Sequence, residues 1–114
     1  MRRLGRHAVI DVSHVAKPLD EAQAAALLAD MAEVCGARVL RIESHHFGAG
    51  HGLTAVALLA ESHISLHEWP EYGFIAFDIF VCGAAEPEPA IELLRARFPE
   101  AHVAAQIIDR ESLS

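Results

Sequence analysis

Two neighbouring segments alternate between apolar and other side chains, and this alternation limits what the chain can fold into more than any other feature. Residues 63–69 put Ile64 and Leu66 on one side of an extended chain and polar or aromatic residues on the other. Residues 74–82 repeat the pattern, with large apolar residues at every second position. A period of two is the period of a β-strand. Because Pro70 ends the first segment, the sequence predicts two adjacent strands that each bury one face.

The remaining elements are predicted from turn residues, helix-forming runs and β-branched runs. Further strands are expected at residues 7–12, 37–42, 53–60 and 102–108, and helices at residues 19–35 and 87–98. An alanine-rich interior favours the first helix, which Gly36 ends, and prolines open the second. A glycine-rich loop is expected at residues 47–52. This order predicts an α+β fold in which an antiparallel sheet carries two helices on one face.

The helices should turn apolar stripes toward the sheet. The expected stripes are Leu27, Met31 and Val34 in the first helix, and Ile91, Leu94 and Phe98 in the second. Beyond residue 108 the tail is expected to fray. The other sheet face would carry the histidines, the serine and the tryptophan of residues 63–69. We therefore expect that face to form a site or to meet a partner.

Size and composition limit the partners that the chain can have. At 114 residues, of which 53% are hydrophobic, it is expected to be one domain (1–114) that gains from dimerisation. No apolar run approaches the length of a membrane span, and a net charge of −7 argues against a nucleic-acid partner. The first ten residues lack the apolar core of a signal peptide. Cys35 and Cys82 are therefore expected to be free thiols in the cytoplasm.

A dense run of reactive side-chain types lies at residues 61–71, and a cysteine follows at Cys82. The run holds two serines, two histidines, a tryptophan and glutamates, which can act as nucleophile, general base, stacking ring and hydrogen-bond acceptor. No Gly-x-Ser-x-Gly turn surrounds Ser62, so a Ser-His-Asp hydrolase is weakly supported. Spelled out, the pattern is Glu-Ser-His, three residues, His, then Trp-Pro-Glu, and later Asp-x-Phe-x-Cys-Gly.

This pattern resembles the self-cleavage and active-site segment of bacterial S-adenosylmethionine decarboxylase, the pyruvoyl enzyme of polyamine synthesis. The resemblance begins at residues 4–7 (Leu-Gly-Arg-His) and continues through Gly36 and Phe47 to Gly83. It implies the α/β sandwich of that family, with sheet faces that meet in a dimer and sites shared between the two chains. S-adenosylmethionine is the implied substrate, and arginine or ornithine is the alternative on the same scaffold.

The resemblance also implies that the chain processes itself. Ser62 would attack the carbonyl of Glu61, and β-elimination with loss of ammonia would leave a pyruvoyl group at the new N-terminus. The products would be a β chain of residues 1–61 and an α chain of residues 62–114. The pyruvoyl ketone would form a Schiff base with the substrate amine and withdraw the electrons released with carbon dioxide. No pyridoxal phosphate and no metal are expected.

Further residues match the family's functional positions. His67 matches the processing base, Thr54 a processing hydroxyl that is commonly serine in relatives, and Cys82 the proton donor. The substrate-binding matches are Phe47 and Trp69 for adenine stacking and Glu71 for the ribose hydroxyls. Aromatic faces suit adenine, and they also attract the sulfonium cation of the substrate.

The sequence departs from the family pattern at three places. The loop after Phe47 is shorter than in relatives and lacks their usual proline. Glu68 stands where threonine is common, although strand alternation points it away from the face of His67. Ala55 replaces a frequent glycine.

Eight histidines leave a metal-binding module as a competing interpretation. His63 and His67 would share one face of a helix, but on a strand they lie about 13 Å apart, too far to share one ion. A loop cluster of His45, His46 and His51 has no defined ligand spacing. A non-enzymatic dimer of ferredoxin-like type would account for the sheet but would leave the motif unexplained.

Overall fold

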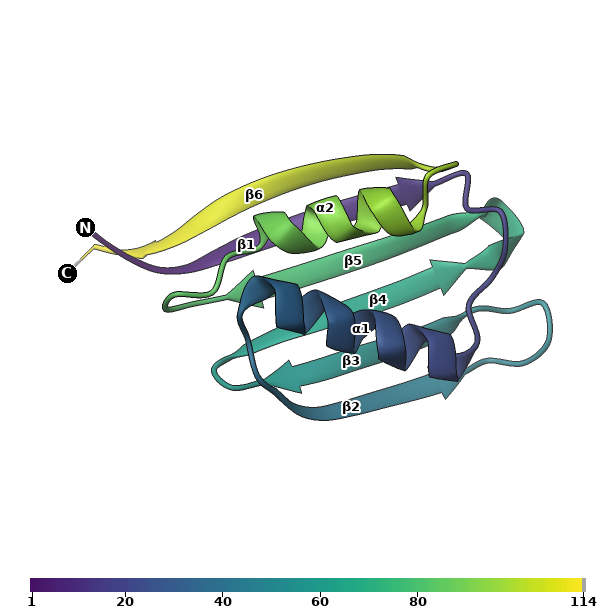
Figure 1. Cartoon of the computed structure of the whole chain (residues 1–114), viewed down its shortest axis with the longest axis horizontal. Helices are drawn as coiled ribbons and strands as arrows, with labels where there is room; N and C mark the ends of the chain where they lie inside the picture. The colour runs from purple at the N-terminus through teal and green to yellow at the C-terminus, as the bar shows by residue number, and fades with distance from the viewer. Residues whose placement is uncertain (114) are drawn as a thin grey trace.

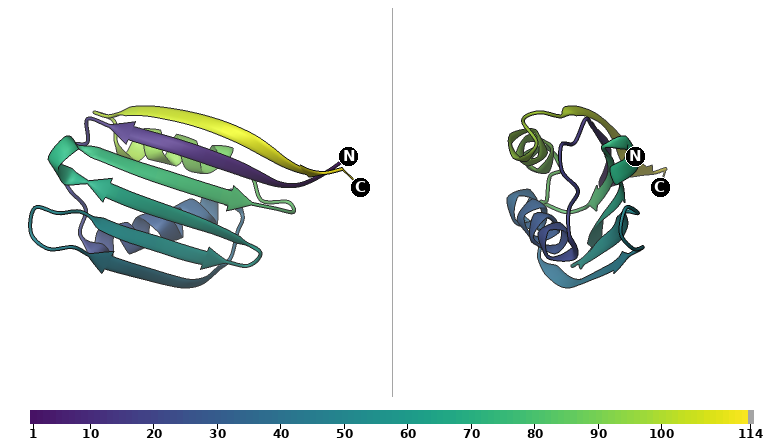
Figure 2. Two further views of the ribbon diagram at one scale, coloured as in Figure 1. Left: turned by 180° about the vertical axis from the view of Figure 1, so that it is seen from behind. Right: turned by 90° about the vertical axis from the view of Figure 1, so that its right-hand side faces the viewer.

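The computed structural model is one six-stranded antiparallel sheet whose strand order is β2-β3-β4-β5-β1-β6, with both helices on one face (Figure 1, Figure 2). The structure describes residues 1–113. The elements are β1 (Arg2–Ser13), α1 (Glu21–Cys35), β2 (Val39–His46), β3 (Leu53–Leu59), β4 (Ser62–Trp69), the 3₁₀ helix η1 (Pro70–Tyr72), β5 (Phe74–Val81), α2 (Glu88–Arg97) and β6 (His102–Ser112). The predicted fold class and element order are confirmed.

The core lies between the helices and the sheet, and the alternating residues of the central strands build it. In β5 the buried positions are Ile75, Phe77, Ile79 and Val81, as the alternation predicts. The predicted inward residues of the second helix, Ile91, Leu94 and Phe98, are also buried. Strand parity therefore decides which side chains face the helices and which remain on the opposite face.

The predicted stripe of α1 is wrong at one position. Leu27 and Met31 are buried, but Val34 is 41% exposed. The buried arc also includes Ala24 and Ala32, whose small side chains let the helix approach the sheet closely. Val34 lies at the edge of that arc. Neither α1 nor α2, within the described residues, has the length and apolar character of a membrane-spanning helix.

The start of α1 is fixed by a capping box and by a hydrogen bond to β4. The Asp20 carboxylate accepts a hydrogen bond from the Gln23 amide (2.7 Å), and the Gln23 side chain accepts one from the Asp20 amide (3.0 Å). The helix therefore begins at Glu21 rather than at residue 19. Just before it, the amide of Leu19 donates to the buried Glu68 carboxylate at 2.7 Å. This contact confirms that Glu68 points toward the helix side of the sheet.

Three strands differ from their predicted bounds by more than one residue. β1 and β6 are longer than predicted, and β6 pairs with β1 as far as Ser112 opposite Arg2, so the tail is not frayed up to that point. β2 begins at Val39 and ends at His46, whereas the prediction was residues 37–42. Edge strands are held by backbone hydrogen bonds, so their polar, exposed residues gave no alternating signal.

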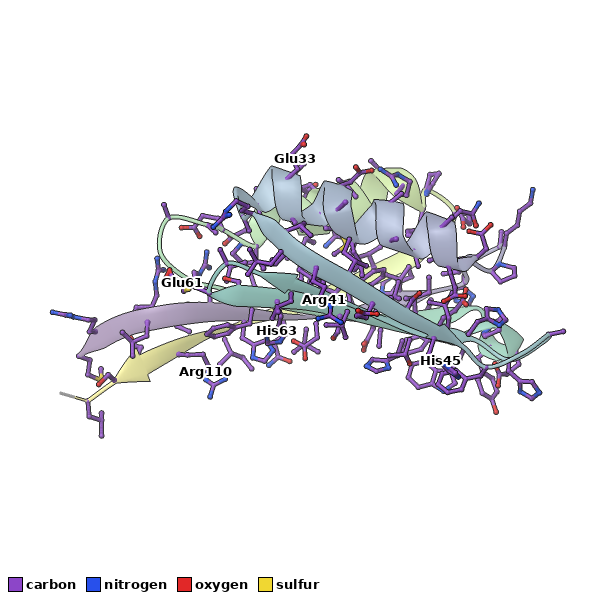
Figure 3. The ribbon with its side chains drawn as sticks, turned by 90° about the horizontal axis from the view of Figure 1, so that it is seen from below. Glu33, Arg41, His45, Glu61, His63 and Arg110 are labelled. Atoms are coloured by element: carbon purple, nitrogen blue, oxygen red, sulfur yellow. The ribbon has the colours of Figure 1, made fainter. Side chains whose placement is uncertain are left out.

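The sheet face away from the helices, called the open face below, mixes apolar and titratable side chains. In Figure 3, His63, His45 and Arg110 extend from this side, whereas Glu33 extends from the outer side of α1. Its apolar residues Val9, Val56, Leu58 and Ile108 are between 39% and 52% exposed. Apolar side chains gathered on neighbouring strands form a surface suited to contact with another protein.

Candidate active site

The predicted scissile bond, between Glu61 and Ser62, lies in the tight turn that joins β3 to β4. Glu61 has a φ angle of 66°, in the left-handed region that costs a residue with a side chain about 1–2 kcal/mol. Ser62 follows as the first residue of β4 and is buried. Figure 3 shows Glu61 at the tip of this turn, at one end of the sheet. The fold therefore holds the bond in one strained conformation.

Cys82 reaches the same turn from the end of β5. Its Sγ lies 3.0 Å from the carbonyl oxygen of Glu61, in the geometry of a thiol that donates to it, and 3.7 Å from Oγ of Ser62. The predicted nucleophile, the predicted scissile carbonyl and the predicted proton donor thus form one group, called the cleavage cluster (Glu61, Ser62 and Cys82). A donor on a carbonyl oxygen stabilises the negative charge that develops there during nucleophilic attack.

The other predicted site residues line a cavity of about 290 Å³ at the opposite end of β4. They are Phe47, Thr54, His67, Trp69 and Glu71, called the pocket cluster. Oγ1 of Thr54 lies 3.2 Å from Nδ1 of His67, so the hydroxyl can fix the orientation of the ring. Phe47 and Trp69 are 58% and 40% exposed, which leaves ring faces accessible to a planar ligand.

The pocket keeps its shape through close backbone contact and ring packing. A Cβ at Gly52 would lie 1.8 Å from the carbonyl oxygen of Glu68, so only glycine lets the chain just before β3 approach β4 this closely. The Trp69 ring packs on Phe74 with ring centres 5.6 Å apart, and the Phe47 ring contacts His45 at 4.7 Å. Both predicted stacking rings are therefore supported by a second ring.

The two clusters lie far apart within one chain. At the rise of a strand, about 3.3 Å per residue, Ser62 and His67 are roughly 17 Å apart. Figure 3 agrees, since Glu61 lies at the end of the sheet opposite to His45, the residue that pairs with Thr54. His67 therefore cannot act on Ser62 of the same chain, and the two predicted processing residues are not brought together by the fold alone.

The histidines do not gather as the competing interpretation required. His63 and His67 lie on strand β4, and His46 accepts a hydrogen bond from the Gly48 amide at 3.0 Å through Nδ1. Within residues 1–113 no group of three or more His, Cys, Asp or Glu side chains is arranged to hold a metal ion.

Two further features lie outside both clusters. A cavity of about 520 Å³ opens on the helix side, between the start of α1 and the end of α2, but it contains none of the predicted site residues. Cys35 is a buried free thiol, and burial raises its pKa to about 11. Its position in the core gives it a packing role. The candidate site therefore consists of the smaller cavity and the cleavage cluster.

Contacts made by residues 4–7 could not be assigned from the sequence. His7 hydrogen-bonds through Nε2 to Oδ1 of Asp78, and its ring centre lies 5.8 Å from that of Phe80. Arg6 binds carboxylates beyond the end of β5. The only sequence signal for these contacts was that both segments match the family pattern, because periodicity gives no information about pairing between distant strands.

Comparison with known proteins gives the family of this chain. The S-adenosylmethionine decarboxylase family model matches residues 6–111. An S-adenosylmethionine decarboxylase proenzyme of Methanococcus aeolicus is 43% identical over 98 residues, which are 83% of this chain and 83% of that protein. The proenzyme of Prochlorococcus marinus is 40% identical over 96% of this chain and 89% of its own length.

A solved structure gives the same result for the fold. The crystal structure of the adenosylmethionine decarboxylase from Aquifex aeolicus matches with a TM-score of 0.85 and 26% identity, over 100% of this chain and 96% of that one. These relatives carry the name of S-adenosylmethionine, so the alternative substrates arginine and ornithine are not favoured. The resemblance predicted from the motif is confirmed: the chain belongs to the S-adenosylmethionine decarboxylase family.

Proposed function

We propose that the chain is a self-processing decarboxylase, which makes a pyruvoyl group from Ser62 and uses it to remove the carboxyl group of S-adenosylmethionine. The observation that carries this proposal is the 3.0 Å hydrogen bond from the Cys82 thiol to the carbonyl oxygen of Glu61. It supplies a donor to the carbonyl that cleavage must polarise. The product would be the aminopropyl donor of spermidine synthesis, and the two free thiols suit the reducing cytoplasm.

Cleavage begins when the Ser62 hydroxyl attacks the carbonyl carbon of Glu61. A new O–C bond forms, the C–N bond breaks, and the amide becomes an ester with a free amine on Ser62. The left-handed backbone of Glu61 is strained in the intact chain, and breaking the peptide bond releases that strain. Cys82 already donates to the oxygen on which negative charge develops.

The second step removes the α-proton of Ser62, and His67 is the base that the motif offers. Proton removal expels the carboxylate of Glu61, and hydrolysis by water then releases ammonia and leaves the ketone. Because His67 lies roughly 17 Å from Ser62 in its own chain, the base must come from a second copy. Thr54, at 3.2 Å from Nδ1, would hold the imidazole for this transfer.

A dimer that joins the open faces would bring the cleavage cluster of one chain to the pocket cluster of the other. Twofold symmetry would then create two identical composite sites. Three observations support it: the separation of the clusters, the exposed apolar residues of the open face, and a cavity of about 290 Å³. That volume is at the low end of small-molecule sites, which span roughly 300–1,000 Å³, so a second chain would enlarge and cover it.

The residues around Ser62 fit a pyruvoyl group. Once formed from Ser62, that group would supply an electron sink for the pair released as carbon dioxide leaves the substrate. Cys82, whose Sγ lies 3.7 Å from Oγ of Ser62, would give its proton to the carbon that lost carbon dioxide. Ser62 is 9% exposed, so bulk water has little access to the reacting carbon.

The pocket cluster would bind the nucleoside of the substrate. Adenine would stack on the exposed faces of Phe47 and Trp69, and the carboxylate of Glu71 would accept hydrogen bonds from the ribose hydroxyls. The same carboxylate and rings favour a cationic sulfonium. The amino-acid end of the substrate would then point toward the cleavage cluster of the second chain.

Trp69→Ala and Glu71→Gln are expected to raise KM for S-adenosylmethionine while cleavage and kcat stay close to wild type. Loss of a stacking ring costs on the order of 1–3 kcal/mol, about five- to 150-fold in binding. Steady-state kinetics on the cleaved variants measures this. Tyr72→Ala is the matched control, since Tyr72 is 77% exposed and does not line the cavity. Unchanged KM in both cleaved variants would place the nucleoside elsewhere.

Cys82→Ala is expected to cleave slowly, because it removes the donor to the carbonyl of Glu61. After cleavage it is expected to lose about 10²–10⁴-fold in kcat, because it removes the proton donor. The cleaved fraction is followed by intact mass, and turnover by carbon dioxide release. Cys35→Ala, which removes the buried thiol of the core, is expected to retain both. If cleaved Cys82→Ala turns over at the wild-type rate, Cys82 is not the proton donor.

The substrate is tested by offering S-adenosylmethionine, arginine and ornithine side by side. We expect carbon dioxide and the matching amine from S-adenosylmethionine, with little from the other two. Preferential turnover of arginine or ornithine would contradict the proposed substrate while leaving the cleavage chemistry in place.

A further inference from the structure

Residues 4–7 (Leu-Gly-Arg-His) match the family pattern, yet the mechanism above gives them no role. They lie in β1, which pairs with β5, the strand that leads to Cys82, and Arg6 stands opposite Val81. The segment therefore runs beside the last residues before the thiol. It pairs with β6 on its other side, and toward Cys82 its contacts are with β5 and with the loop that follows β5.

Arg6 connects that loop to the sheet by hydrogen bonds to three carboxylates, two beyond the end of β5 and one in β6. Its Nη1 lies 2.5 Å from the carboxylate of Glu86 and 2.8 Å from that of Glu88, and its Nε donates to Asp109 at 3.2 Å. The side chain is 18% exposed. Hydrogen bonds to Glu86 and then Glu88 raise the pKa of Arg6 above its ordinary value. One guanidinium thus joins β1, the loop, the start of α2 and β6.

The loop from Cys82 to α2 depends on such contacts for its path. Its sequence is Cys-Gly-Ala-Ala-Glu-Pro, so it offers few large side chains that could pack. The amide of Ala85 bonds to the carbonyl of Cys82 (3.3 Å), and the amide of Glu86 bonds to the carbonyl of Cys35 (3.1 Å). Glu86 is therefore held through its backbone to α1 and through its side chain to Arg6.

Gly5 and His7 hold the strand that enters this loop. A Cβ at Gly5 would lie 2.4 Å from Cζ of Phe80, so the Phe80 ring rests against bare backbone of β1. His7 hydrogen-bonds to Asp78. Asp78 and Phe80, the two β5 residues nearest to Cys82 that share its strand parity, thus both contact β1 before the chain turns.

We propose that Arg6 is a positioning residue for Cys82, which it keeps on the Glu61 carbonyl by holding Glu86 and the start of α2 against β1. This role rests on the proposed function of Cys82. The hydrogen bonds of the guanidinium go to Glu86, Glu88 and Asp109, none of which belongs to the cleavage cluster, so it acts on Cys82 through the loop. Lysine keeps the charge but cannot reach several carboxylates at once, and Arg6→Lys should therefore recover only part of the effect.

The first measurement is alkylation of Cys82 by iodoacetamide, read by mass spectrometry. It uses the full chain with Ser62→Ala, so that every sample is uncut. The variants are Arg6→Ala, Arg6→Lys and Glu86→Gln, and the control is Arg97→Ala, which breaks the Arg97–Asp30 pair (3.1 Å) between the two helices. Buried Cys35, whose pKa is raised to about 11, is the slow internal reference for intact folding.

Arg6→Ala is expected to raise the alkylation rate of Cys82 several-fold, because the thiol leaves the carbonyl, while Cys35 stays slow and Arg97→Ala matches the parent. In the cleavable chain, Arg6→Ala should lower kcat by about 10²-fold with KM little changed, since a small misplacement of a reacting group has that effect. If Arg6→Ala does not fold, Arg6→Lys and Glu86→Gln give the same comparison with smaller effects.

The proposal would be overturned if Arg6→Ala left both the alkylation rate of Cys82 and kcat unchanged. It would also be overturned if Arg97→Ala changed these two quantities as much as Arg6→Ala does. A wild-type chain that neither cleaves nor decarboxylates would instead overturn the proposed function. The alkylation series would still report whether Arg6 holds the loop.

Discussion

Ser62→Ala is expected to remain a single chain of 114 residues with no decarboxylase activity. Without the hydroxyl nothing attacks the carbonyl of Glu61, so neither the cleavage nor the ketone can arise. The wild-type chain should instead give fragments 1–61 and 62–114, and the second should resist Edman sequencing because its N-terminus carries a ketone instead of an amine. Intact mass spectrometry during incubation measures the cleavage, and carbon dioxide release measures the activity.

Ser65→Ala is the matched control, because it removes a hydroxyl from the same strand, three positions further along β4 and outside both clusters. This variant should cleave and turn over like the wild type. A wild-type chain that decarboxylates S-adenosylmethionine while its mass stays that of the intact chain would rule out the pyruvoyl mechanism. Residual activity of an uncut Ser62→Ala chain would do the same.

Strand parity explains why most of the fold could be predicted from the sequence. The alternation at residues 63–69 predicts that Leu66 and Glu68 face the helices and that His67 lies on the open face. The structure confirms these positions, since Leu66 and Glu68 are buried and His67 is exposed. The bounds of β2 and β6 could not be predicted in this way. Both are edge strands with many exposed residues, so backbone pairing holds them and their side chains carry no period.

The resemblance to the family pattern predicted the members of the candidate site, but which of them lie together depends on strand pairings that the sequence does not contain. Cys82 meets Glu61 because β5 pairs with β4, with Phe80 opposite His63. Arg6 reaches the loop after Cys82 because β1 pairs with β5. Conversely, Ser62 and His67 are close in sequence, yet an extended strand separates them.

Co-expression of Ser62→Ala and His67→Ala chains is expected to restore activity that neither variant has alone. In a mixed dimer, one composite site combines Ser62 and Cys82 from the His67→Ala chain with His67 from the Ser62→Ala chain, and is complete. The other site lacks both residues. With random pairing, half of the dimers are mixed and each holds one intact site, so activity should recover to about a quarter of wild type.

The identity of the cut chain gives a second, independent readout. Only the His67→Ala chain carries the serine, so it should be the chain that is cleaved, although it lacks its own base. Two affinity tags of different mass let intact mass spectrometry assign the fragments and allow the mixed dimer to be purified. The purified mixed dimer should then show about half of the wild-type activity, since one of its two sites is complete.

Ser62→Ala with Cys82→Ala is the control pair, because both residues belong to the cleavage cluster. Every site in their mixed dimer keeps one defect in that cluster, so a shared-site dimer predicts no recovery for this pair and recovery for the first. If each chain carried a complete site of its own, neither pair would recover. If both pairs recovered equally, the two clusters would not be divided between chains. The roughly 17 Å that β4 puts between Ser62 and His67 leads us to expect recovery in the first pair alone.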